Sequence, residues 1–420
     1  MKLTKESHKL MSFFIKQKCL LTINQTQMKK TDEILESLYN EIMRAVSYIK
    51  SLKANVNKPF YKCKIKKITN TNKIPKPSTF DYNILPIEVR NHIDKSSISS
   101  SSLTYDFNLF NRDITIIFIV EHDEPEQLLE TYNNYVDYML VWLYIANTHS
   151  TGNCAKNLKI FVYHTTLLKE LPTSNTNILN ENNVNTAFTR TCPVDSEIIV
   201  FRKEEWFKVF IHETFHNFGL DFSDINLSEY NEKILNIFPV NSDVNLYEAY
   251  TECWARIINA LFCSFIIMKD KNDVEEFLTN SEMFINLERI FAFFQVVKVL
   301  NFMGLSYEDL YKKTKLSENL RKTFYKENTN VLAYYVISLV LINSYQEFML
   351  WCNINNISLF RFKRTHKNLD GFCRFIESKY KIKSILDGIN CTKNVLSRIK
   401  RKPDISYLLK NMRMTICELG

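Results

Sequence analysis

The chain has 420 residues, which is enough for two or three domains around sizeable cores. Hydrophobic residues make up 45% and charged residues 24%, which excludes an intrinsically disordered protein, and the presence of only 6 Gly and 9 Pro favours long helices over an all-β architecture. The net charge of +8 lies at the two ends, since residues 1–100 carry 19 Lys and Arg against 8 Asp and Glu, and residues 361–420 carry 15 against 5. Basic ends can bind nucleic acid or an anionic membrane, although solvated lysine-rich faces explain such an excess more simply.

Targeting signals and cysteine pattern suggest the compartment. The first residues lack an apolar core and a small-residue cleavage site, so we expect no signal peptide. The most apolar stretch, residues 331–342, is too short to span a bilayer and predicts a buried helix. The ten cysteines lie singly along the chain with no CxxC pair, which predicts reduced thiols in an intracellular protein.

The first hundred residues predict one clear helix. Residues 31–53 begin with a Thr-Asp cap and keep apolar side chains three and four positions apart. A lysine-rich stretch with several prolines follows at residues 57–77 and should be extended or loop. The serine-rich residues 96–102 are the best candidate for a domain boundary.

A mixed sheet with packed helices is predicted next, and the chain beyond residue 275 is expected to be almost wholly helical. Residues 103–110 and 114–121, separated by Asn111–Asp113, predict a β-hairpin. The remaining elements of the sheet region are a helix at 125–147, strands at 158–164, 185–189 and 197–201, a helix at 204–218 and an apolar helix at 245–268.

Residues 204–222, EEWFKVFIHETFHNFGLDF, contain the pattern His-Glu-x-x-His. On a helix, His212 and His216 lie on one face and can bind one metal ion. Glu213 points roughly a hundred degrees away around the helix, where its carboxylate can take a proton from metal-activated water without binding the metal. The motif is surrounded by apolar residues, so the polar groups are costly to bury unless they are paired or metallated. The pattern predicts a single-zinc metallohydrolase, and most simply a peptidase.

A catalytic zinc needs a third protein ligand and an open position. In the metzincin pattern, HExxHxxGxxH/D, Gly219 fits, but the ligand position holds Phe222 and Asp221 is one residue short. Gly219 is better explained as a helix C-cap in the left-handed conformation. Replacing Asp221 is therefore expected to have little effect on the metal.

The helix at 245–268 offers two carboxylates, Glu248 and Glu252, on one face. Two carboxylates beside a cation lose the repulsion that they would otherwise have. Glu252 could instead pair with Arg256 one turn further on. We favour Glu248 over Glu252 as the third ligand, and we rank Asp221 and Asp224 below both as candidates.

An ExxxE pair that follows HExxH resembles the gluzincin arrangement. The resemblance implies that Glu248 binds the zinc and that Glu252 holds a ligand histidine. Residues 185–260, with the HExxH segment and the segment EAYTE, also resemble the uncharacterised zincin-like proteins of large nucleocytoplasmic DNA viruses. This second resemblance implies a gluzincin-like metallopeptidase made in the cytoplasm of an infected cell or packaged in a virion.

Weaker candidates surround this site. The strand at 185–189 could pair with an extended peptide substrate, or be an ordinary strand. A donor for the developing oxyanion is often Tyr or His, and those available are Tyr247, Tyr250, His164 and His366. Cys253 is expected to be a core thiol.

The sequence therefore predicts an α+β protein with three regions: a basic, mainly helical N-terminal region (1–100), a zincin-like catalytic region (103–270) and a helical C-terminal region (275–420). We expect Zn²⁺ held by His212, His216 and Glu248, with Glu213 as general base, acting on a protein or peptide substrate and without a membrane span. Two alternatives remain open: a zinc-stabilised structural or virion protein without activity, and a nucleic-acid-binding protein that acts through its basic ends.

Overall fold

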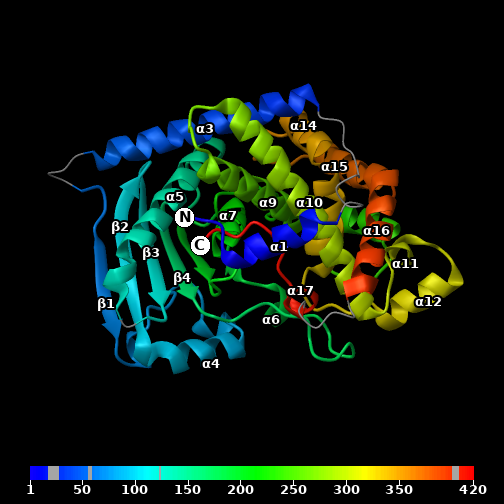
Figure 1. The fold of residues 1–420 in the computed structure, drawn as a ribbon, viewed down its shortest axis with the longest axis horizontal. Coiled ribbons are helices and arrows are strands. Elements are labelled where there is room, and N and C mark those ends of the chain that lie inside the picture. The colour runs from blue at the N-terminus through cyan, green and yellow to red at the C-terminus, as the bar shows by residue number, and fades with distance from the viewer. Residues whose placement is uncertain (18–27, 55–58, 123, 400–405) are drawn as a thin grey trace.

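The structure is a computed structural model that describes all residues except 18–27, 55–58, 123 and 400–405. A mixed six-stranded sheet lies on one side of the molecule, and helices of the C-terminal half lie on the other (Figure 1). The predicted α+β class is confirmed.

The strands follow the order β1-β2-β3-β4-β6-β5. Pairing is antiparallel from β1 to β3, parallel through β3, β4 and β6, and antiparallel again for the edge strand β5. The hairpin between β2 and β3 is confirmed, but its turn is Phe110–Asn111, slightly earlier than predicted, because both residues adopt left-handed φ angles of 54° and 57°. The strand bounds are β1 (Cys63–Ile68), β2 (Ser100–Leu109), β3 (Arg112–Val120), β4 (Asn157–His164), β5 (Ala187–Thr189) and β6 (Asp195–Val200).

Helices connect the strands and build most of the C-terminal half. Within the described part of the first 240 residues they are α1 (Lys5–Ile15), α3 (Lys29–Lys53), α4 (Ile87–Ser96), α5 (Leu129–His149), α6 (Glu181–Val184), α7 (Trp206–Asn217) and α8 (Ser228–Ile237). Those that follow are α9 (Leu246–Ile267), α10 (Val274–Met303), α11 (Tyr307–Tyr311), α12 (Lys315–Phe324), the π-helical η5 (Leu332–Ile337), α13 (Ser338–Asn343), α14 (Tyr345–Asn355), α15 (His366–Lys379), α16 (Lys383–Ile399) and α17 (Ser406–Lys410). Short 3₁₀ turns are η1 (Thr71–Lys73), η2 (Tyr82–Ile84), η3 (Ser97–Ser99) and η4 (Pro125–Leu128).

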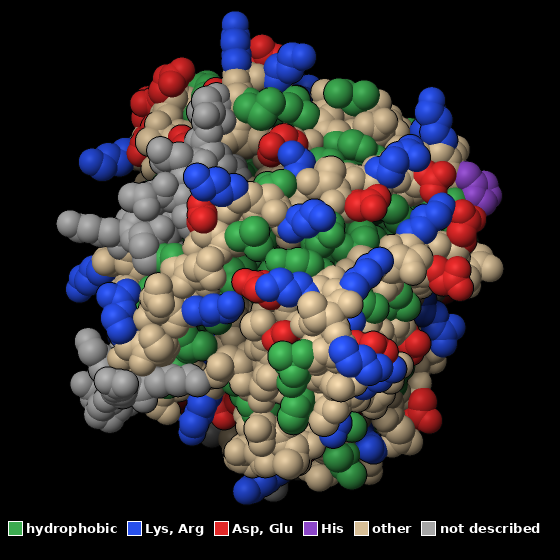
Figure 2. Space-filling view, turned by 90° about the vertical axis from the view of Figure 1, so that its right-hand side faces the viewer, with side chains coloured by type: hydrophobic (Ala, Val, Ile, Leu, Met, Phe, Trp, Pro, Cys, Tyr) green, Lys and Arg blue, Asp and Glu red, His purple; other side chains and the backbone are tan. Residues whose placement is uncertain are grey.

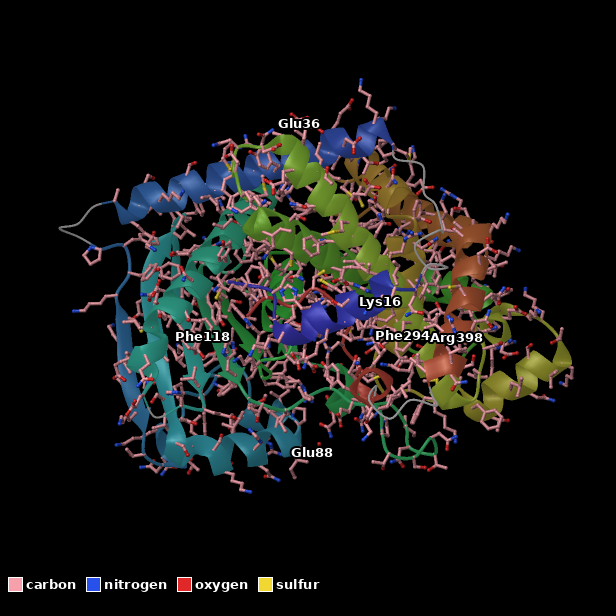
Figure 3. All side chains as sticks on the ribbon, in the orientation of Figure 1. Lys16, Glu36, Glu88, Phe118, Phe294 and Arg398 are labelled. Atoms are coloured by element: carbon pink, nitrogen blue, oxygen red, sulfur yellow. A yellow bond between two sulfur atoms is a disulfide. The ribbon has the colours of Figure 1, made fainter. Side chains whose placement is uncertain are left out.

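Apolar strand residues point to both faces of the sheet, and other elements pack over each face and bury them. Phe118 on β3, labelled in Figure 3, is buried in the main core, where its ring lies 4.9 Å from that of Tyr132 on α5 and 5.9 Å from that of Trp206 on α7. Residues of the opposite face, such as Ile119 and Phe161, form a smaller core with α4. The main core continues into the helical half, where Phe294 of α10 contacts Phe14 of α1.

Several local predictions can be compared with this fold. The helix predicted at 31–53 is α3, and the buried helix predicted at 331–342 is η5 followed by α13. The serine-rich segment does not form a linker, since Ser100–Ser102 begin β2 and pair with β1. In the described part of the chain, no helix is both long and apolar enough to cross a membrane.

The prediction of reduced thiols is wrong, because the described residues include a disulfide. Cys154, after α5, and Cys192, between β5 and β6, form a disulfide although they are 38 positions apart in the sequence. The sheet brings their two loops together at one end, which the cysteine spacing does not reveal. Cys253 is a buried free thiol, as predicted.

Side chains of both charges are mixed on the helical side of the molecule. On the face formed by the right-hand side of Figure 1, Lys and Arg side chains are interspersed with Asp and Glu (Figure 2). Among the ion pairs of the structure, Lys233 contacts both Glu229 and Asp370. The basic excess of the C-terminal region therefore does not form one continuous basic surface among the side chains coloured in this view.

Candidate metal centre

The helix α7 presents the HExxH motif and is followed by a glycine turn. It begins soon after β6 and ends at Asn217, and Gly219, two residues further on, has a left-handed φ of 63°. The N–H of Gly219 donates to the carbonyl of His216, and the N–H of Leu220 donates to that of Phe215, which is the Schellman pattern. The predicted C-cap role of Gly219 is therefore confirmed. Phe222 is buried against Phe362, so the position of the metzincin ligand belongs to the core.

Three donor atoms from two helices converge beside α7. The Nε2 atoms of His212 and His216 are 3.2 Å apart, and Oε2 of Glu248 on α9 lies 3.0 Å from the first and 3.4 Å from the second. These three residues could together hold a metal ion. For a tetrahedral ion with bonds of about 2.0–2.1 Å, the ligand atoms would be about 3.3–3.4 Å apart. The observed triangle is close to that spacing.

A carboxylate lies behind each imidazole. Nδ1 of His212 is 3.2 Å from Oε2 of Glu252, and Nδ1 of His216 is 2.5 Å from Oδ2 of Asp221. In the tautomer with a proton on each Nδ1, these protons face the carboxylates and both Nε2 lone pairs point to the place where an ion would bind. In that tautomer the three facing atoms are all acceptors, and a divalent cation would remove their repulsion.

Glu252 has a second partner that fixes its position. Its two carboxylate oxygens accept hydrogen bonds from Nζ of Lys208 at 3.0 and 2.9 Å, and both side chains are buried. Lys208 lies one turn before His212 on α7, so one helix face presents both partners of Glu252. The alternative pairing of Glu252 with Arg256 is wrong, because Arg256 bonds to Glu288 on α10.

Asp221 and Asp224 do not join the ligand cluster. Asp221 is fully buried and accepts from His216 on the side away from Glu248, while Asp224 pairs with Arg364 near the surface. The sequence placed Asp221 below Glu248 as a candidate ligand, and it did not indicate that Asp221 contacts the imidazole of His216. Its position five residues after His216, beyond the left-handed Gly219, was the only signal.

Burial and charge together set the protonation of the cluster. Burial alone would lower the pKa of the His216 imidazole, but Asp221 and Glu248 raise it well above its ordinary value. Burial opposes ionisation of Glu252, yet Lys208 and His212 lower the pKa of its carboxyl to about 2. For Glu248, the two histidines likewise outweigh burial and lower the pKa. Both glutamates are thus anionic, as a ligand and its supporting group must be.

Glu213 lines a small cavity next to the cluster. The cavity has a volume of about 30 Å³, and its wall includes His212, Thr186 and Ala187 beside the edge strand, and Tyr334 of η5. Its volume has room for roughly two water molecules. Burial raises the pKa of the Glu213 carboxyl, opposed by the nearby histidines. A carboxylate with a raised pKa next to water is suited to accept a proton.

Tyr334 brings to the cluster a hydroxyl that the sequence did not single out. Its Oη donates to Oε2 of Glu248 at 3.1 Å, and its ring lies 5.9 Å from that of His212. It occupies a π-helical turn, a feature common at functional sites. With 21 tyrosines in the chain, no local pattern marked this one.

The four predicted oxyanion donors lie in different surroundings. Tyr247 lies beside His216, with ring centroids 5.8 Å apart. The others have partners elsewhere: Tyr250 donates to the carbonyl of Phe360, while His164 and His366 bond to Tyr132 and Tyr230.

Comparison of the chain with known protein families, with curated proteins and with solved structures gave no match.

Proposed function

We propose that the chain is a zinc-dependent peptidase with a zincin-like catalytic region. The observation that supports this most directly is the triangle of His212, His216 and Glu248 donor atoms, at spacings suited to one tetrahedral ion, with Glu213 on the adjoining cavity. Two imidazoles and a carboxylate, with a fourth position open, are the donor set of catalytic zinc. Bound zinc would supply Lewis acidity and make water a nucleophile near neutral pH.

The side chains of the protein would then divide the proton transfers. Glu213 would accept a proton from water in the cavity and deliver it to the amine of the cleaved peptide bond. The hydroxyl of Tyr334, already directed at Glu248, would donate to the substrate oxygen as negative charge develops there. The edge strand β5, which borders the cavity at Ala187, would pair with the extended peptide.

The small volume of the cavity favours a second candidate, a zinc-stabilised structural protein. A cavity of about 30 Å³ holds water but no peptide, so catalysis would require movement of its wall. A structural site, however, has no use for Glu213, which is not a ligand. The test therefore depends on this residue.

The experiment compares the wild type with Glu213→Gln, which keeps the size of the side chain and removes the base. A peptidase should lose about 10²–10⁴-fold of its activity on a peptide library while retaining its zinc. Glu229→Gln, at an exposed glutamate on α8, is the control and should behave as wild type. A scaffold would give no cleavage with any of the three proteins.

Metal analysis tests the site itself. Purified protein should contain about one zinc per chain, and a double variant with His212→Ala and His216→Ala should contain almost none. Equal zinc in both proteins would exclude this site.

A further inference from the structure

The disulfide between Cys154 and Cys192 packs against the C-terminal end of the metal-site helix. The backbone N–H of Cys192 donates to the carbonyl of His216 at 3.2 Å. A Cβ added at Gly219, the residue after the C-cap of α7, would lie 3.3 Å from Sγ of Cys154 and 3.4 Å from Cβ of Cys192. The cross-link thus touches the same turn of helix that carries one candidate metal ligand.

A chain of hydrogen bonds leads from the disulfide loop to the imidazole of His216. The hydroxyl of Thr191, next to Cys192, bonds to the hydroxyl of Ser223 at 2.7 Å. The Ser223 hydroxyl donates to Oδ1 of Asp221 at 3.0 Å, and Oδ2 of Asp221 contacts Nδ1 of His216. The disulfide loop therefore helps to orient the carboxylate that orients this histidine.

The loops joined by the disulfide hold backbone conformations that are unfavourable without restraint. Cys192 has a φ of 48° and Ala155, next to Cys154, has a φ of 52°, both in the left-handed region that side chains with a Cβ rarely adopt. The N–H of Ala155 donates to the carbonyl of Pro193, which ties the two loops a second time. Because the cross-link helps to maintain these conformations, its loss would let the Thr191–Cys192 segment relax.

We propose that the Cys154–Cys192 disulfide controls the metal affinity of the site, so that its reduction weakens metal binding through Thr191, Ser223 and Asp221. This inference rests on the metal site of the proposed function. A dithiol reductant would transfer two electrons and two protons: the protein S–S bond breaks to give two cysteine thiols, and the reductant closes to its own disulfide. Cys192 is partly exposed and Cys154 is buried, so the reductant would attack the Cys192 sulfur.

The effect should be partial, because other contacts hold the backbone around Asp221. The guanidinium of Arg364 donates to the carbonyls of Asp221 and Gly219 at 3.0 and 2.9 Å, independently of the disulfide. Reduction would therefore loosen the carboxylate and leave α7 in place. We expect zinc affinity to fall about tenfold, the lower end of what loss of a supporting contact causes.

The experiment measures zinc affinity by competition with a chromophoric chelator in oxidised protein, in protein reduced by a phosphine that is then removed, and in a double variant with Cys154→Ser and Cys192→Ser. Thr191→Val interrupts the hydrogen-bond chain without touching the cysteines. Two controls are matched to these changes. Thr176→Val loses a similar hydroxyl contact, to Ser174, in an exposed turn, and Cys63→Ser replaces a free thiol.

Reduction, the double variant and Thr191→Val should each lower the affinity about tenfold, the controls should not, and reduction should add little to Thr191→Val. Equal zinc affinity in oxidised and reduced protein and in Thr191→Val would overturn the inference while leaving the metal site intact. Failure of oxidised wild type to bind zinc would instead refute the proposed function. If the double variant does not fold, Thr191→Val and reduction in place still decide the question.

Discussion

Replacement of Asp221 is the change for which sequence and structure give opposite expectations. The sequence predicts little effect, because Asp221 is one residue short of a ligand position. In the structure its carboxylate is fully buried and lies 2.5 Å from Nδ1 of His216. Asp221→Ala would leave that imidazole free to rotate and its N–H without an acceptor.

The size of the effect follows from these contacts. Loss of a group that supports a metal ligand weakens binding about 10–100-fold, equivalent to about 1.4–2.8 kcal/mol. Because the contact is short and buried, we expect Asp221→Ala to lie near the upper end. A buried donor without a partner should also cost about 1–3 kcal/mol of folding stability. Asp221→Asn keeps an acceptor oxygen without the charge, so its zinc affinity should fall less.

The assay is zinc competition with a chelator, together with thermal unfolding of the metal-free protein. Asp224→Ala is the matched control, since that carboxylate lies three residues away and is 40% exposed beside Arg364. It should change zinc affinity less than twofold. If Asp221→Ala binds zinc as wild type does while His216→Ala does not, the supporting role assigned to Asp221 is wrong.

Three further predictions follow from buried groups. Glu248→Ala should remove zinc binding, whereas Glu252→Ala should weaken it about 10–100-fold, as chelator competition would show. Glu252→Ala should also destabilise the fold by about 3–5 kcal/mol in urea unfolding, because Lys208 is left buried and unpaired. Burial lowers the pKa of the His164 imidazole to about 3, whereas the unfolded chain takes up this proton near 6.5, so the folded state loses stability as pH falls through that range. Between pH 6.5 and 5 the loss should be about 1.6 kcal/mol, and urea unfolding at both pH values should show a smaller loss for His164→Phe. A Gly→Ala change inside a helix ordinarily stabilises it by about 1 kcal/mol. Gly388→Ala should instead destabilise the protein by about 1–3 kcal/mol, because the added Cβ would overlap the ring of Phe293. An increase in melting temperature would contradict this.

Some of the site could be read from local spacing. The pairing of His212 with His216, and of Glu248 with Glu252, follows from the four-residue repeat of a helix face, which needs no tertiary information. The left-handed conformation at Gly219 is equally local, because helix ends commonly require it. The strands and the motif helix followed from hydrophobic periodicity in the same way.

The tertiary structure alone decided which residues support these groups. Lys208 reaches Glu252 only because α7 packs on α9, and Tyr334 reaches Glu248 only through the packing of η5. The disulfide joins two loops that the parallel strands β4 and β6 bring to the same end of the sheet, and no spacing of cysteines encodes that. Periodicity records which face of an element is apolar, whereas contacts between distant elements depend on how those faces pack. The sequence by itself thus determined the candidate ligands and the candidate base, and only the packed fold decided what holds them in place.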